Sequence, residues 1–334
     1  MTRFSRRMAL TAPVAAALGY AASRPVFAAL AQDASTMRET SVTVTLLPVT
    51  VTDANGNEVT VTDVSRIVPL SGDIAEIVWD LGLGANIVAV DVSATFPPPL
   101  LALPKVGYER VLNAEGILAM EPTVVIGKQA AGPPEVLEQV AGAGVPLVIV
   151  ASSETIEAPM EKIAAVSTAL GVVDAGQVLA AHVAEEIKAA QALAAQAPTK
   201  PSALVMLIQE GGVQLVGGGG TVASAMLEAA GATDAAAAAG IMGYQPITPE
   251  ALVAAAPEII VTMAMGAEAV GGLEGVAALP GVAETPAGQN GRIYLYDDEM
   301  LVGMTPRTGQ QLMAMIADFH PELAGADPEA TPAG

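Results

Sequence analysis

The sequence of 334 residues contains no cysteine and only two histidines. The missing thiols exclude disulfide bonds, thiolate metal sites, a cysteine nucleophile and an anchor built on a lipid-modified cysteine. Two histidines are too few for most histidine-rich metal sites. Aromatic residues make up only 3% of the chain, so each tyrosine that lies within a motif is informative.

Basic residues are also scarce, because 14 Lys and Arg stand against 35 Asp and Glu and give a formal net charge of -21. A surface this acidic repels phosphate backbones and anionic lipids, so a nucleic-acid partner is not expected. Hydrophobic residues make up 52% of the sequence, which is enough to bury a large core in one or two lobes.

The first 31 residues are typical of an export signal. Three arginines lie within the first seven residues, an alanine-rich apolar stretch follows over 8–22, and Ala29-Leu30-Ala31 offers a small-residue cleavage site. The apolar stretch is short for a membrane span, although an N-terminal anchor is the alternative. Ser5-Arg6-Arg7 partly matches a twin-arginine signal. We therefore expect residues 1–31 to be a signal peptide and the remainder to be periplasmic, without a lipid anchor.

Strand and helix patterns alternate along the rest of the chain. Two β-branched runs on either side of 53–57 predict a hairpin within 41–62. The further expected strands are 66–70, 87–92, 124–126, 147–150, 203–208, 259–262 and 292–295, and the expected helices are 71–81, 134–143, 157–170, 221–230, 248–255 and 307–319. This alternation predicts an α/β fold with mainly parallel sheets.

One expected helix is much longer than the others. From Asp174 to about Gln196 the chain consists mainly of Ala, Glu, Gln, Lys and Leu and contains no proline, which strongly favours a helix. This helix divides the sequence into an N-terminal lobe (41–170), a connecting helix (174–197), a C-terminal lobe (201–324) and a loose tail rich in Pro, Ala and Gly (325–334). The expected fold is therefore two Rossmann-like α/β lobes joined by a long rigid helix.

The two lobes share an internal repeat. Gly107-Tyr108, Glu115 and Pro122 precede a strand in the first lobe, and Gly243-Tyr244, Glu250 and Pro257 precede a strand in the second. The glutamate comes seven residues before the proline in both lobes. A chance similarity between alanine-rich segments is the alternative. The repeat predicts two lobes related by a pseudo-two-fold axis.

The tyrosines of the repeat are candidate binding residues. A loop tyrosine between a strand and a helix of an α/β lobe lies at the carboxyl edge of the sheet, where ligands bind. A phenol is a poor ligand at neutral pH unless a metal such as ferric iron stabilises its phenolate, so Tyr108 could bind such a metal with help from Arg110. Tyr244 could cover the opposite face of a flat ligand. The alternative for both tyrosines is a ring that only packs.

Three further charged residues have both a structural and a functional interpretation. Arg307 lies at the start of a predicted helix and could pair with a ligand carboxylate or form an ion pair within its lobe. Glu115 and Glu250 lie in the first turns of short helices, where an acid favours the helix dipole, and they could also dock onto a basic two-fold partner. We find no Ser-His-Asp arrangement and no nucleophile elbow, so an enzyme is not expected.

Several segments together resemble a known family. They are 51–54, 66–68, 106–118, 131–134, 243–246, 279–281 and 303–309, and they span roughly residues 50–320. In these segments the chain resembles the periplasmic haem-binding proteins, which are the substrate-binding components of bacterial haem ABC importers. The most specific segment is Gly107-Tyr108-Glu109-Arg110 with the Ala-Glu-Gly that follows it. The resemblance implies the class III clamshell of two α/β lobes, with the ligand in the cleft between them.

The resemblance also implies roles for individual residues. It implies that Tyr108 is the axial ligand of ferric haem. It implies that Glu115 and Glu250 face the ABC permease dimer at the inner membrane.

Four further haem contacts are expected from position: Arg110, Tyr244, Met304 and Arg307. Relatives carry a Gly-Phe-Gly-like segment before Pro-Arg, whereas this chain has Gly303-Met304-Thr305, so Met304 could take the place of the aromatic ring against the porphyrin.

The expected function is therefore a non-enzymatic, monomeric periplasmic carrier that binds Fe(III) haem as its transported ligand and delivers it to the permease. A cobalamin-binding or ferric-siderophore-binding protein of the same transporter class is one alternative. A siderophore site usually needs more cationic or aromatic residues than this chain supplies, and it would not need Tyr108 as an iron ligand. An exported metal-dependent hydrolase is the other alternative.

Overall fold

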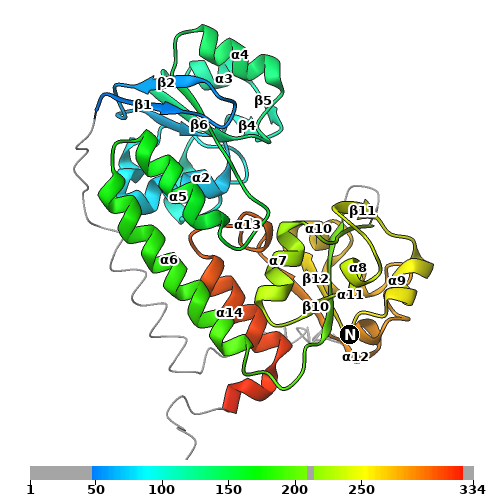
Figure 1. Ribbon diagram of the computed structural model, residues 1–334. Helices are drawn as coiled ribbons and strands as arrows, with labels where there is room; N and C mark the ends of the chain where they lie inside the picture. Colours follow the sequence, from blue (N-terminus) through cyan, green and yellow to red (C-terminus); the bar gives the residue numbers. More distant parts are fainter. Residues whose placement is uncertain (1–46, 209–213, 326–334) are drawn as a thin grey trace, which may run out of the picture. The chain divides into compact units, whose positions relative to one another are not determined.

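The two larger β-sheets of the computed structural model, of three and six strands, lie one in each half of the chain, and the structure describes residues 47–208 and 214–325 (Figure 1). The predicted signal peptide (1–31) and residues 326–334 of the predicted tail lie outside these ranges.

The first lobe begins with the predicted hairpin and continues with a parallel sheet. Strands β1 (Val49–Thr52) and β2 (Glu58–Val61) are antiparallel, and Asp53 closes their turn by accepting the N–H groups of Asn55 and Asn57 at 2.9 and 2.8 Å. The parallel sheet has the order β3 (Ile67–Pro69), β6 (Val124–Lys128), β7 (Leu147–Val150). Its helices are α2 (Gly72–Val78), α3 (Ala114–Leu118), α4 (Pro134–Gly142) and α5 (Ala158–Ala169).

The strand predicted over 87–92 is wrong. This segment makes only isolated bridges, in which Ile87 pairs with Ile67 and Val90 pairs with Lys105. The segment hydrogen-bonds first to β3, through Val88 and Ile67, and then to residues 104–107, so neither pairing extends into a ladder.

The long connecting helix is present as α6 (Val173–Ala194), close to the predicted range of 174–197. It packs against α5 from the first lobe and against α14 (Thr308–Phe319) from the second half of the chain (Figure 1). A Cβ on Gly309 of α14 would lie 2.5 Å from the Cβ of Glu186, so a glycine is what lets α14 approach α6 this closely.

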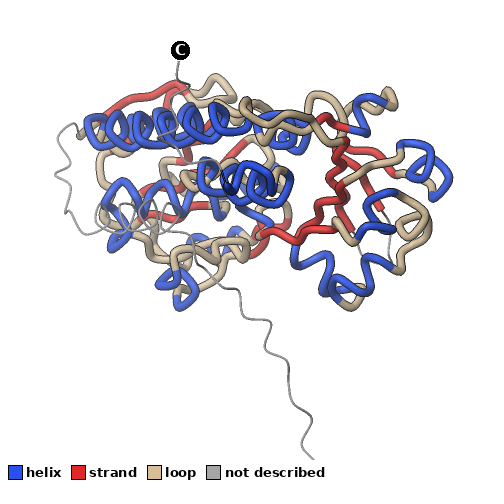
Figure 2. The backbone as a smooth tube through the Cα atoms, turned by 90° about the horizontal axis from the view of Figure 1, so that it is seen from below, coloured by secondary structure: helices blue, strands red, loops and turns tan. Residues whose placement is uncertain are grey.

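The sheet of the second lobe combines parallel and antiparallel strands. Strands β8 (Ser202–Ile208), β12 (Ile259–Met263) and β13 (Ile293–Tyr296) are parallel, and the sheet order is β11-β9-β8-β12-β13. Strands β9 (Gln214–Gly217) and β11 (Tyr244–Pro246) are antiparallel, and the two-residue β10 (Thr233–Asp234) pairs with β8. The helices are α7 (Val222–Ala229), α8 (Ala235–Ala238), α9 (Pro249–Ala255), α10 (Ala264–Ala269), α11 (Gly272–Ala277), α12 (Pro286–Asn290) and α13 (Asp298–Val302). Figure 2 shows helices beside the strands of this sheet.

The repeat predicted from the sequence has the same backbone geometry in both lobes. The glycines of the two Gly-Tyr pairs both have positive φ, +112° and +69°. The side-chain oxygens of Asn113 and Thr248 cap α3 and α9 in the same way, by accepting an N–H three residues on. Glu121 and Ala256, each directly before the proline of the repeat, are both left-handed with φ of 47° and 46°. These three matching backbone features favour a repeat over chance similarity.

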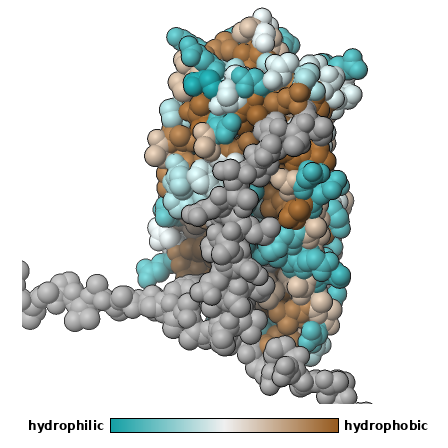
Figure 3. Space-filling model, turned by 90° about the vertical axis from the view of Figure 1, so that its left-hand side faces the viewer, coloured by the Kyte–Doolittle hydropathy of each residue, from teal (hydrophilic) through white to brown (hydrophobic). Residues whose placement is uncertain are grey.

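The molecule therefore has the predicted fold, two α/β lobes joined by a long helix, whereas the proposed lobe boundaries stay predictions. On the face drawn in Figure 3, hydrophobic and hydrophilic residues are interspersed where grey atoms do not cover them. Within the described ranges, every helix is too short or too polar to cross a bilayer.

Candidate functional site

A cavity of about 660 Å³ is lined by residues from both lobes, and we call it the interlobe cavity. Its first-lobe wall is polar and consists of Tyr108, Glu109, Arg110, Lys128, Gln129, Ala130, Ser152 and Glu154. Its second-lobe wall is mainly apolar and consists of Leu207, Ile208, Leu215, Val222, Tyr244, Met263, Val302, Gly303 and Met304. Four predicted contact residues, Tyr108, Arg110, Tyr244 and Met304, therefore meet in one cavity. The combination suits a ligand with a large apolar surface and a polar or metal centre.

Tyr108 is carried by a short hairpin whose backbone is firmly fixed. Strand β4 (Gly107–Tyr108) pairs with β5 (Val111–Leu112), and a Cβ on Gly107 would lie 2.7 Å from the carbonyl oxygen of Val111. The Asp91 carboxylate accepts the N–H of Glu109 at 2.8 Å. Tyr108 is 47% exposed, so its phenol remains accessible.

Tyr244 lies on the edge strand β11, where it pairs with Gly217 of β9. Burial, and secondarily the carboxylate of Glu154, raise the pKa of Tyr244. This tyrosine therefore stays a neutral phenol, which can stack on a flat ligand or donate a hydrogen bond.

Glu154 also links the two lobes directly. It follows β7 in the first lobe, and its Oε2 accepts the N–H of Val222, 3.0 Å away, in the first turn of α7. Both residues line the interlobe cavity, so one edge of the cavity is closed by a hydrogen bond between the lobes.

Lys128 connects the cavity to a buried charge cluster that the sequence alone does not predict. Its Nζ lies 3.1 Å from Oδ1 of Asp73 and 3.5 Å from Oε1 of Glu109. Asp73 is completely buried and also pairs with the completely buried Lys162. Burial alone would raise the pKa of Asp73, but Lys162 and Lys128 together hold it well below its usual range. Two sequence features could have predicted this cluster: a lysine within an apolar strand segment, at 128, and a lysine within a helix segment, at 162.

Glu299 of α13 brings a further carboxyl group to this cluster. A Cβ added to Gly72 would lie 2.9 Å from Cδ of Glu299, and a Cβ added to Gly303 would lie 2.6 Å from its Oε2. Both distances are too short, so the two glycines make room for the Glu299 side chain. Burial and, next, the negative charge of Asp73 raise the pKa of Glu299 to about 8. At neutral pH this carboxyl group is therefore mostly protonated.

This raised pKa predicts a pH-dependent stability. In the folded protein Glu299 keeps its proton up to about pH 8, whereas in the unfolded chain it releases the proton near its ordinary pKa of 4.5. Its contribution to the free energy of unfolding is therefore complete below pH 4.5 and is lost as the pH rises through about 8. From pH 5 to pH 9 the free energy of unfolding of the unmodified protein should fall as this contribution is lost. We expect the fall to be roughly 2 to 4 kcal/mol smaller for Glu299→Gln, whose side chain does not titrate. Urea unfolding at both pH values measures this difference, with the exposed Glu250→Gln as control. Parallel pH profiles for Glu299→Gln and the unmodified protein would contradict the assignment.

Arg307 does not line the interlobe cavity. It is 9% exposed, and its Nε and one terminal nitrogen each donate to Glu76 of α2 at 2.8 Å. Its guanidinium carbon lies 3.9 Å from the centre of the Phe96 ring. The structure thus places Arg307 in a buried ion pair with the first lobe, and its contact with haem stays a prediction.

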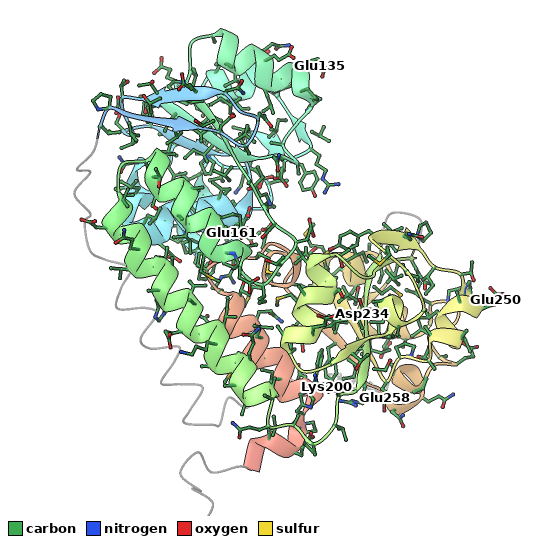
Figure 4. The ribbon with its side chains drawn as sticks, viewed as in Figure 1. Glu135, Glu161, Lys200, Asp234, Glu250 and Glu258 are labelled. Atoms are coloured by element: carbon green, nitrogen blue, oxygen red, sulfur yellow. The ribbon has the colours of Figure 1, made fainter. Side chains whose placement is uncertain are left out.

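The two glutamates of the repeat are exposed in the first turns of α3 and α9, as the sequence predicts. Figure 4 shows Glu250 projecting from α9. The two histidines are not cavity residues: His182 lies 3.4 Å from Glu186, and Nε2 of the buried His320 lies 3.1 Å from the carbonyl oxygen of Ala230. Among the described side chains, no group of three or more His, Asp and Glu is arranged to hold a metal ion.

The family model described as "Periplasmic binding protein" matches residues 67–300. Among solved structures, the periplasmic heme-binding protein RhuT from Roseiflexus sp. RS-1 is 46% identical with a TM-score of 0.76, covering 78% of this chain and 100% of that one. The periplasmic heme-binding protein BhuT, solved in complex with two hemes, is 37% identical with a TM-score of 0.72, covering 77% and 98%.

Curated proteins give two further similarities. The uncharacterized ABC transporter substrate-binding lipoprotein YvrC of Bacillus subtilis is 24% identical over 282 residues, which cover 83% of this chain and 87% of that protein. The vitamin B12-binding protein of Vibrio cholerae is 36% identical over 72 residues only, which cover 22% of this chain and 26% of that protein.

Proposed function

Because the chain belongs to the periplasmic binding protein family, we propose that it binds haem in the periplasm and delivers it to an ABC permease of the inner membrane. Members of this family are binding proteins, and we propose no catalytic activity for this chain. The similarity to heme-binding proteins over three quarters of the chain supports haem as the ligand.

The observation that carries this proposal is the accessible phenol of Tyr108 on the wall of the interlobe cavity, facing a space whose second-lobe wall is mainly apolar. Haem is flat and largely apolar, so the apolar wall would receive the porphyrin. The oxygen of Tyr108 would bind the iron as a phenolate, which ferric iron stabilises. Arg110, on the same hairpin and also lining the cavity, would stabilise the negative charge of that oxygen.

Tyr244 and Met304 would complete the site from the second lobe. Tyr244 stays a neutral phenol and would stack on the porphyrin or donate a hydrogen bond to it. Met304 is 2% exposed at the cavity wall, where its thioether would pack against the ring. The transported ligand would thus be held by one iron–oxygen coordination bond and by contacts with Tyr244 and Met304.

Delivery requires docking on the permease. Glu115 and Glu250 occupy equivalent exposed positions on the two lobes, and we propose that a monomer of this protein presents both acids to basic residues of the permease dimer. The chain has no cysteine for a lipid anchor, so we propose a periplasmic protein released after removal of the signal peptide.

A cobalamin carrier of the same transporter class is the second candidate, because the 72-residue similarity to a vitamin B12-binding protein favours it. Cobalt in cobalamin needs no phenolate, so this candidate leaves Tyr108 without a specific role.

Titration of the protein lacking residues 1–31 with haemin, iron-free protoporphyrin IX, cyanocobalamin and a ferric hydroxamate siderophore separates the candidates. We expect haemin to bind with the charge-transfer absorption of a ferric phenolate, and iron-free protoporphyrin to bind at least about tenfold more weakly, because it lacks the iron–oxygen bond. Tight cyanocobalamin binding without any haemin spectrum would overturn the proposal in favour of the second candidate.

A further inference from the structure

Lys162 of α5 is completely buried and has two partners. Its Nζ donates to the carboxylate of Asp73 and to the carbonyl oxygen of Gly303, 2.6 Å away. A buried ion pair often stabilises a fold no better than apolar residues of the same volume would, and its best-attested use is to specify one arrangement. Here the arrangement that Lys162 specifies is the position of the Gly303 carbonyl, which belongs to the second half of the chain.

Gly303 begins the turn that carries Met304. Met304 has a left-handed backbone, with φ of 49°, which is unfavourable for any residue that has a side chain. Such a conformation persists only where the surrounding structure determines it. Val302, Gly303 and Met304 all line the interlobe cavity, so this strained turn forms part of the wall that faces the ligand.

The first lobe holds this turn from both sides. Before the turn, the carboxyl group of Glu299 fits beside Gly72 at the start of α2. After the turn, Arg307 is bound to Glu76 of α2 by two hydrogen bonds of 2.8 Å. Between these two contacts, the bond from Lys162 fixes the peptide directly before Met304.

The Asp73 carboxylate also connects Lys162, which holds the Gly303 carbonyl, to the interlobe cavity. Its Oδ2 holds Lys162, its Oδ1 lies 3.1 Å from Nζ of Lys128, and Lys128 lines the cavity. One buried carboxylate therefore fixes both a cation at the cavity wall and the cation that supports the Met304 turn.

We propose that Lys162, held by Asp73, is a positioning residue that keeps Met304 against the bound ligand through the carbonyl group of Gly303. The proposal rests on the proposed function, since it takes the occupant of the interlobe cavity to be haem.

A double-mutant cycle tests whether Lys162 acts through Met304. The paired variant Asp73→Asn/Lys162→Leu removes the bond to Gly303 together with both completely buried charges, and Lys128 keeps Glu109, 3.5 Å away, as its partner. We expect this pair to weaken haemin binding about tenfold in the unmodified background, and less than about twofold in a Met304→Ala background, where the supported side chain is already gone. An equal loss in both backgrounds would mean a general structural effect and would overturn the proposal. If the paired variant does not fold, Asp73→Asn/Lys162→Met, which also has no donor for the Gly303 carbonyl, replaces it in the same cycle.

A second readout needs no haem. With methionines labelled at the 13C methyl group, the Met304 resonance is assigned as the one absent from Met304→Leu. We expect this resonance to shift in the paired variant and to stay in place in Lys188→Gln, which alters an exposed lysine of α6. An unshifted Met304 resonance in the folded paired variant would contradict the positioning role. If the unmodified protein bound no haemin, the proposed function would fail while this measurement still decided whether Lys162 sets the turn.

Discussion

Tyr108→Phe is expected to weaken haemin binding at least about 100-fold, which corresponds to about 2.7 kcal/mol, and to abolish the charge-transfer absorption of the ferric phenolate. The substitution removes one oxygen and keeps the ring, and the hairpin that carries it is fixed by backbone pairing between β4 and β5. Packing in the interlobe cavity should therefore be unchanged, so the loss measures the iron–oxygen bond. Absorption spectra during a haemin titration give both quantities.

Tyr244→Phe is the matched control for this experiment. It also removes one phenol oxygen from the interlobe cavity, but Tyr244 stays neutral because burial and Glu154 raise its pKa. We expect the charge-transfer band to survive and the affinity to fall no more than about tenfold, the usual effect of a lost hydrogen bond. If Tyr108→Phe kept the band and Tyr244→Phe lost it, the axial ligand would come from the second lobe.

Arg307→Met is expected to lower the free energy of unfolding by about 3 to 5 kcal/mol. The Glu76 side chain is 2% exposed, and without Arg307 its carboxylate would stay buried and lose both guanidinium bonds. The contact with the Phe96 ring would be lost as well. Urea unfolding measures the change, and the loss should be larger than for most single substitutions.

Two further variants show whether the buried pair causes this effect. Glu76→Gln/Arg307→Met removes both charges and is expected to recover part of the lost stability. Lys188→Met breaks an exposed pair with Glu185, in which both side chains are about three-quarters exposed, and is expected to cost less than about 1 kcal/mol. A similar small loss for Arg307→Met would show that the contact between α2 and the start of α14 is not a stabilising link between the lobes.

Local patterns in the sequence predicted most of the fold. A long helix was recognisable because alanine, leucine and long polar residues favour a helix at every position, and α6 (Val173–Ala194) occupies most of the predicted range of 174–197. Strands β9, β10 and β11 were not predicted, because they are only two to four residues long and β9 ends within a glycine run. Strands this short are decided by their partners in the sheet and leave little periodicity to detect.

Part of the candidate site could be predicted from the sequence, because part of it lies in a local sequence repeat. The tyrosines were found because the Gly-Tyr repeat marks equivalent loops, and both line the interlobe cavity. The partner of Arg307 was not predictable, because Glu76 lies 231 residues away in the sequence. The same holds for Asp73 and Lys162, which are 89 residues apart and meet only in the folded protein.

A crystal structure of the protein with ferric haem tests the central claim most directly. The account predicts porphyrin in the interlobe cavity, with the phenol oxygen of Tyr108 at bonding distance from the iron and Met304 against the ring. Haem bound elsewhere, or bound in the cavity with Tyr108 turned away from the iron, would contradict it.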